Sequence, residues 1–194
     1  MDLVQRAQGI LLRPKEEWAK IKGETTTVSE LFISYAMILA AVPPLARFIG
    51  RLLYRSEIPF ARVPVWSVGR ALSNAVLSYM FSLAIVYLFA LIIDALAPNF
   101  SSAQNMTNSM KLAVFSMTPV WVAGIFYIIP NLGDLAMLAG LYGLYVLYEG
   151  FQTPMIETPR DKVLGFLVVS IIAAVALFIV AGLILGVLYV RRVA

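Results

Sequence analysis

The sequence has no cysteine and no histidine, and only 13% of its 194 residues are charged. Without cysteine there is no thiol chemistry and no disulfide, and without histidine the commonest general base and zinc ligand are missing. A soluble domain carries about 25% charged residues. Because 61% of this chain is hydrophobic, more than a soluble protein of this size could bury, the composition predicts an integral membrane protein.

The net charge of +4 is modest and spread along the chain. It fits a protein that lies against anionic lipid and does not indicate a nucleic-acid groove. The methionines form no dense repeat, so no copper site is predicted, and we expect neither a cofactor nor a bound metal. Membrane lipids are the expected partners, and other proteins or a second copy of the chain are further candidates.

Residues 1–27 are predicted to form an amphipathic segment at the cytoplasmic membrane surface. Apolar residues recur at helical spacing from Leu3 to Ile10, and early polar residues argue against a cleaved signal peptide. Pro14 can start a second short helix, which Gly23 can end.

Two placements of this segment are open. In the first, Trp18 and Ile21 face the lipid, and Trp18, Arg13 and Lys15 lie in the membrane interface. In the second, the segment folds under the bundle as a plug, with Trp18 inserted between spans.

The rest of the chain, residues 28–194, predicts an all-α polytopic membrane protein, a bundle of about five transmembrane helices. Thr27 and Glu30 have the spacing of a capping box just before the first apolar stretch. The last stretch would be ~42 Å long at ~1.5 Å per residue, longer than the ~30 Å bilayer core, and should tilt or project. The expected spans are residues 28–53, 68–97, 111–129, 132–151 and 163–190.

Three prolines lie inside the expected spans. Pro43 and Pro44 fall in the first span and Pro119 in the third. Each removes a backbone donor, so these helices should break or bend, and the carbonyls near Leu39 and Ala40 should become free for other partners.

Ionisable residues within spans are costly and tend to be functional, which makes Asp94, Lys111, Asp134 and Glu149 candidates. Asp94 ends one span and Lys111 begins the next, so we predict an ion pair between them. Asp134 and Glu149 are separated by ~21–22 Å of helix, less than the ~30 Å core. They either reach water at the helix ends, or snorkel, pair or line a wet cavity.

Arg47, Arg51 and Arg55 are spaced by four residues and line one face of a helix. Asp134 enters the membrane on the side where the first span leaves it. The stripe is therefore predicted either to pair with Asp134 through Arg47 or to bind lipid phosphates.

Small residues form two seams, Gly140 with Gly143 in the fourth span and Gly182 with Gly186 in the fifth. Small residues let helices approach closely in lipid. The seams indicate either tight packing within the bundle or, for the fifth span, dimerisation.

Four segments resemble bacterial members of the Yip family of Ypt- and Rab-interacting membrane proteins. These are residues 6–18, with Arg13-Pro14-Lys15-Glu16-Glu17-Trp18 at the end, and residues 115–125, 139–145 and 159–162. The resemblance implies five spans, a cytoplasmic N-terminus and a bacterial inner-membrane location. It carries no catalytic residue, and eukaryotic members are tied to vesicle traffic and membrane shaping. The arginines at 47, 51 and 55 depart from the family pattern.

Basic residues divide almost equally between the two sides of a five-span topology, and the leading segment favours a cytoplasmic N-terminus. We predict a non-enzymatic protein that organises membrane lipid or partner proteins. The alternative is a small transporter or channel built on the broken helices and intramembrane carboxylates. A continuous polar cavity reaching Asp94 or Asp134 would favour transport, and a dry bundle would favour the first function.

Overall fold

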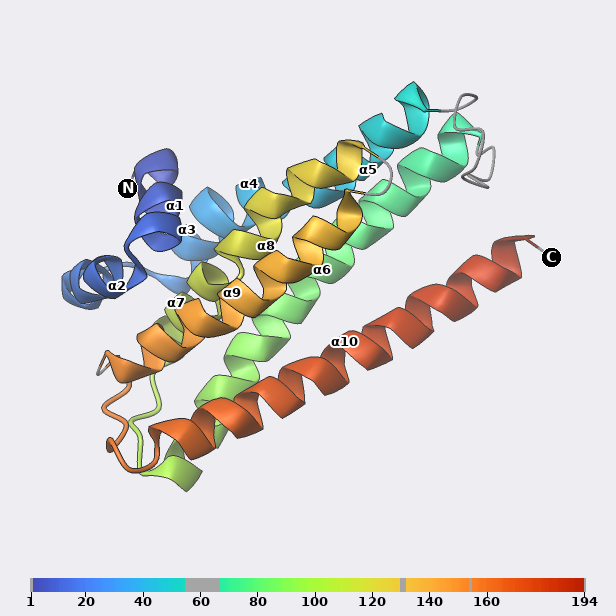
Figure 1. The fold of residues 1–194 in the computed structure, drawn as a ribbon. Coiled ribbons are helices and arrows are strands. Elements are labelled where there is room, and N and C mark those ends of the chain that lie inside the picture. Colours follow the sequence, from blue (N-terminus) through green and yellow to red (C-terminus); the bar gives the residue numbers. More distant parts are fainter. Residues whose placement is uncertain (1, 55–66, 130–131, 154, 194) are drawn as a thin grey trace.

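The computed structural model describes residues 2–54, 67–129, 132–153 and 155–193, and this part of the chain is helical with no strand. Long helices run along one common direction, while two short helices lie across one end (Figure 1). In chain order the elements are α1 (Leu3–Leu12), α2 (Pro14–Gly23), α3 (Val28–Leu31), η1 (Phe32–Ala36), α4 (Met37–Leu39), α5 (Val42–Leu53), α6 (Val68–Leu96), η2 (Ala97–Phe100), α7 (Met106–Ser116), α8 (Thr118–Ala123), η3 (Gly124–Ile128), α9 (Gly133–Gln152) and α10 (Val163–Val193).

Among the described residues, three helical stretches are long and apolar enough to cross a membrane: Val28–Leu53, Val68–Phe100 and Met106–Ile128. The first begins where the capping box predicted, since the Thr27 side chain accepts a hydrogen bond from the backbone of Glu30 at 3.1 Å. The predicted start of the third at residue 111 was wrong. That helix begins at Met106, because the Asn105 side chain caps it by accepting from the backbone N–H of Asn108 at 3.0 Å.

The prolines break both helices as predicted. The first stretch has a π-helical turn at η1 and then separates into α4 and α5 just before Pro43, and the third separates into α7 and α8 just before Pro119. The Tyr79 hydroxyl of α6 donates to the Met37 carbonyl beside the first break at 2.9 Å, so a neighbouring helix supplies a donor where the helix is irregular.

The two broken helices pack against each other through α5 and η3. A Cβ at Gly124 would lie 2.7 Å from Cβ of Pro43, and one at Gly50 would lie 2.8 Å from the Tyr127 carbonyl oxygen. Glycine at both positions therefore lets α5 and η3 pack closer together than any side chain would allow.

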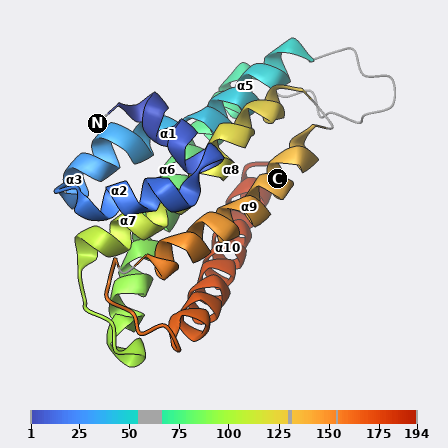
Figure 2. The same cartoon turned by 60° about the vertical axis from the view of Figure 1, so that its left-hand side comes forward.

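One hydrophobic core joins the short N-terminal helices to the long ones. Its largest fully buried side chains come from α2, η1, α7, α8 and α10, namely Trp18, Tyr35, Phe115, Trp121 and Phe166. Figure 2 shows α1 and α2 lying against the bundle near α7 and α8.

Helix α10 packs on α6 and α9 through its first half and stands apart from them further on (Figure 1). Ile179, Val180 and Leu183 are exposed. A Cβ at Gly182 would meet nothing within 4 Å, so this member of the predicted seam does not pack within the bundle. The surroundings of Gly186 lie outside the described residues.

Candidate functional site

The N-terminal helices α1 and α2 form a tight hairpin. The Asp2 side chain caps α1 by accepting from the backbone N–H of Val4 at 3.0 Å, and Pro14 occupies the first position of α2 as predicted. Gly9 lies where the helices meet, because a Cβ there would be 2.6 Å from a carboxylate oxygen of Glu17. The hairpin depends on this missing side chain.

Trp18 anchors the hairpin inside the bundle. The side chain is 0% exposed, and its Nε1 donates to the Val146 carbonyl of α9 at 2.9 Å. Its ring meets the ring of Phe115 edge-on, with the centroids 6.0 Å apart. A Cβ at Gly150 would lie 2.7 Å from the indole, so glycine at this position makes the room for it.

Of the two placements left open, the structure has the one with Trp18 inserted between spans, here α7 and α9, and the one in which Trp18 and Ile21 face the lipid was therefore wrong. Both are fully buried, because α9 offers an acceptor for the indole N–H and space for its rings. Tyr142 of α9 makes a second hydrogen bond between the bundle and the hairpin, since its hydroxyl donates to the Leu11 carbonyl at 2.8 Å. Arg13 and Lys15 remain on the exposed side of the hairpin.

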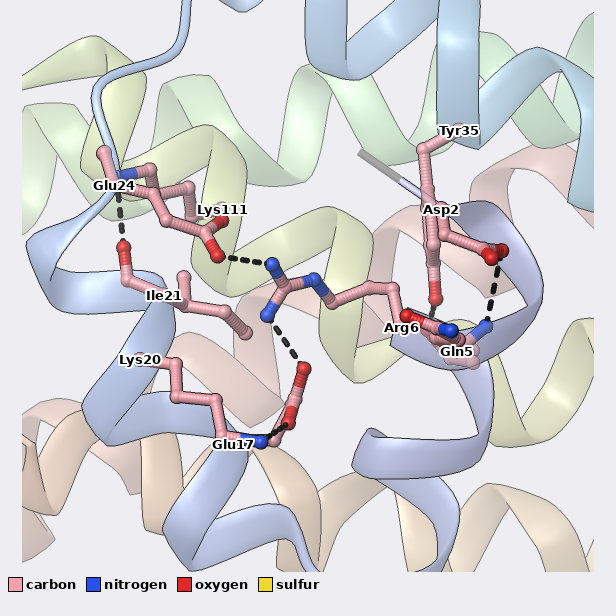
Figure 3. Close-up of polar contacts among 10 residues, drawn as sticks. Asp2, Gln5, Arg6, Glu17, Lys20, Ile21, Glu24, Tyr35 and Lys111 are labelled. Carbon is pink, nitrogen blue, oxygen red and sulfur yellow. Dashed lines mark hydrogen bonds and ion pairs between the residues drawn. The ribbon is translucent and has the colours of Figure 1, made fainter.

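A buried charge cluster lies beneath the hairpin, centred on Arg6 (Figure 3). The Arg6 guanidinium bonds to Glu17 at 2.6 Å and to Glu24, and Lys20 bonds to the other oxygen of Glu17 at 3.0 Å. The Arg6 and Glu17 side chains are only 7% and 8% exposed. Such a pair is costly to break, because either partner alone would be an uncompensated buried charge.

Lys111 of α7 completes the cluster from the bundle side. It is 3% exposed, and its Nζ donates to the carbonyls of Ile21 at 3.1 Å and Glu24 at 2.7 Å. These carbonyls lie at the end of α2, where the helix dipole attracts a cation. The predicted Asp94–Lys111 ion pair was wrong, since Asp94 accepts instead from the Ser109 hydroxyl at 3.3 Å.

Arg6, Glu17 and Glu24 were not among the candidate residues drawn from the sequence. The helical spacing of Arg6 does indicate burial. Arg6 follows Leu3 by three residues and precedes Ile10 by four, which places it on the apolar face of α1. The partners of Arg6 could not be found this way, since they lie on a different helix and on the connection after it.

A hollow of about 710 Å³ opens beside this cluster. Its walls come from α1, from α2 and the connection that follows it, from α3 and η1, and from α7. The lining includes charges of both signs, among them Arg13, Lys20, Glu24 and Glu30. Figure 3 shows Arg6 reaching between Glu17 and Glu24, with Lys111 beside Glu24.

A second cavity of about 550 Å³ lies between α6, α8, α9 and α10. Its lining is almost entirely apolar and includes Gly140 and Gly143. Between the two cavities the core is filled by side chains such as Phe115, with the Tyr35 and Thr118 hydroxyls bonded to each other at 2.9 Å. Neither cavity is lined by any of the three candidate carboxylates, Asp94, Asp134 and Glu149.

The glycines of α9 differ in their surroundings. A Cβ at Gly143 would lie 2.9 Å from the Ser116 carbonyl oxygen, whereas one at Gly140 would meet nothing within 4 Å. Gly143 therefore allows a close helix contact, and Gly140 only borders the apolar cavity. Glu149 is half-buried near the end of the same helix.

The predicted Arg47–Asp134 pair was also wrong. The Arg47 guanidinium lies 4.2 Å from the centroid of the Tyr127 ring, and Asp134 is exposed at the start of α9. A cation over an aromatic face is stabilised without a carboxylate. Arg47 and Arg51 line a small cavity of about 30 Å³ against α6, and Arg55 lies outside the described residues.

This architecture, long apolar helices closed at one end by a docked helical hairpin, defines a membrane protein. Residues 9–183 match the Yip1 domain, and the chain belongs to this family, as the resemblance implied. It is similar to the inner membrane protein YohC of Escherichia coli, in strain K12 and in strain O6:H1, with 25% identity over 122 residues in each case. That alignment covers 63% of this chain and 63% of each relative. No solved structure matches the chain.

Proposed function

We propose that this protein is a non-enzymatic, five-span protein of the inner membrane that organises membrane lipid or partner proteins through its N-terminal hairpin. One observation carries the proposal: the hairpin is built into the bundle and forms a charged hollow at one end, above an apolar core. A polar recess at one end of an apolar bundle suits recognition at the membrane surface.

Side chains fill the core below the hollow and leave no water path in the part that the structure describes, which favours this function over transport. The first helix break is packed against the third apolar stretch, with Gly124 on Pro43. The second break borders the apolar cavity through Met117 and Val120. Transport sites at broken helices line a water-filled cavity. The cavities described above instead end against side chains such as Phe115 or are lined by apolar groups.

The arrangement of the helix ends supports an odd number of crossings, as in the proposed five-span topology. The hairpin lies at the end of the bundle where α7 and α10 begin and α9 ends, whereas α10 ends toward the opposite side (Figure 1). An odd number of crossings separates the two termini in this way. The relatives named above are inner membrane proteins.

Single-cysteine labelling distinguishes the proposed function from transport, because the chain has no cysteine of its own. Ser34→Cys, which lines the hollow, should react with a charged thiol reagent in native membranes, while Thr118→Cys in the buried core should react only after denaturation. Rapid labelling of Thr118→Cys by the charged reagent would reveal a water path and support a transporter instead.

The same approach tests the orientation. Ser67→Cys, exposed at the start of α6, should be labelled by an impermeant reagent on intact cells, and Lys15→Cys and Asn99→Cys only after permeabilisation. The reverse pattern would overturn the cytoplasmic placement of the N-terminus.

A further inference from the structure

The hollow beneath the hairpin is lined by charges of both signs. Arg13 and Lys20, with side chains 74% and 66% exposed, come from the α1–α2 hairpin. Glu24 and Glu30 come from the connection after α2 and from α3. A ligand with a negative group and a positive group would therefore meet complementary charges within one recess.

The floor of the hollow is already neutralised. Arg6 is held by Glu17 and Glu24, and Lys111 by two backbone carbonyls. These deep groups fix the shape of the recess, because each charge among them has a bonded partner. Three charges on its sides are also paired: Arg13 with Glu16 at 3.6 Å, Lys20 with Glu17 at 3.0 Å, and Glu24 with Arg6. Each of these groups has several donors or acceptors, so it can bond to a ligand while keeping its partner.

The hollow also borders the lipid-facing side of the first apolar helix. Ser34 lines it from the π-helical turn η1, a feature often found at functional sites. Ile38, Leu45 and Ile49 are exposed farther along the same stretch, on α4 and α5. They form an exposed apolar stripe beyond the charged recess.

We propose that the hollow binds the headgroup of a zwitterionic phospholipid of the ethanolamine type, with its acyl chains along this stripe. The phosphate would bond to Arg13 and Lys20, and the ammonium would donate to Glu24 and Glu30. The hollow volume of about 710 Å³ falls within the range of about 300–1,000 Å³ that suits one small ligand. This inference rests on the proposed function, of which it names the ligand class.

Native mass spectrometry of the full-length protein in detergent tests the proposal. The protein is titrated with phospholipids that carry identical acyl chains and an ethanolamine, choline or glycerol headgroup. Ethanolamine lipid should bind most tightly, because its ammonium donates hydrogen bonds that choline cannot make and its charge is absent from glycerol. Equal affinity for the three headgroups would overturn the proposal.

Two charge variants test the ammonium and the phosphate of the headgroup separately. Glu30→Gln should weaken ethanolamine-lipid binding about threefold, in line with an exposed ion pair, and leave glycerol-lipid binding unchanged. Lys20→Gln should weaken all three lipids about equally. Glu157→Gln and Lys22→Gln are matched controls, since both residues are exposed and neither lines the hollow.

A steric variant keeps the test decisive if a charge variant fails to fold. Ser34→Leu fills the hollow from η1 without removing a charge, and should weaken ethanolamine-lipid binding while the melting temperature stays near that of the parent. Undiminished binding in Ser34→Leu would place the lipid elsewhere. Failure here is distinguishable from failure of the proposed function, which the labelling of Thr118→Cys decides separately.

Discussion

Docking of the N-terminal hairpin depends on a glycine in α9, and Gly150→Ala tests it. The added Cβ would lie 2.7 Å from the Trp18 ring and 2.7 Å from a methyl group of Leu112. The leucine methyl can rotate away, but the indole is fixed by its bond to the Val146 carbonyl. We therefore expect the substitution to push Trp18, and with it α2, out of the bundle.

The magnitude follows from the overpacking alone, because the higher helix propensity of alanine acts on α9 equally in the docked and open states. Overpacking a buried site costs about 1–3 kcal/mol, and the lower end applies because the leucine methyl can rotate away. The free energy of hairpin docking should fall by about 1 kcal/mol, which changes the open population about fivefold. Gly140→Ala, in the same helix, adds a Cβ with nothing within 4 Å and should leave docking unchanged.

The assay uses a single cysteine at Ile21, which is fully buried beneath the hairpin. In the Ile21→Cys background, the rate of reaction with a thiol reagent under native conditions reports the opening of α2. We expect Gly150→Ala to label about fivefold faster than the Ile21→Cys parent, and Gly140→Ala no faster. Equal rates for the two alanine variants would refute the argument that Trp18 holds the hairpin in place.

Three further substitutions test other contacts. Lys111→Met should also speed labelling of Ile21→Cys, because two buried carbonyls lose their donor at a cost of about 1–3 kcal/mol; an unchanged rate would contradict this. Arg47→Gln should lower the free energy of unfolding by about 0.5–1 kcal/mol, and in a Tyr127→Leu background the effect should vanish. Gly143→Ala should lower the melting temperature in detergent, because its Cβ would lie 2.9 Å from a backbone carbonyl oxygen of α7; an equal melting temperature would argue against a tight seam.

Local signals predicted the helical elements well. Pro14 and Gly23 bound α2, the Thr27 cap starts the first apolar stretch, and Pro43 and Pro119 lie where the helices break. Each of these features is decided within a few residues of chain, by a missing donor or a capping oxygen. The start of α7 was missed because the cap at Asn105 lies in a polar stretch that resembles a loop.

The pairing of charges was not predictable in this way. The sequence placed Asp94 near Lys111 and Asp134 near Arg47, because each pair belongs to the same end of the bundle. In the structure, Lys111 donates to the carbonyls at the end of α2, and Arg47 lies over the Tyr127 ring. A cationic side chain can donate to a carbonyl or a carboxylate, or lie over an aromatic face, so its partner depends on which group the fold brings within reach.

The sequence by itself determined that this is a helical membrane protein of the Yip type, since its apolar content, its long apolar stretches and its family segments are properties of the chain alone. Tertiary structure decided the site. An amphipathic hairpin with Trp18 on one face can bury that face in lipid or in protein, and the periodicity is the same in both cases. The outcome was decided by the space at Gly150, the carbonyl of Val146 that accepts from the indole, and the cation of Lys111, which together favour burial of the hairpin in the bundle.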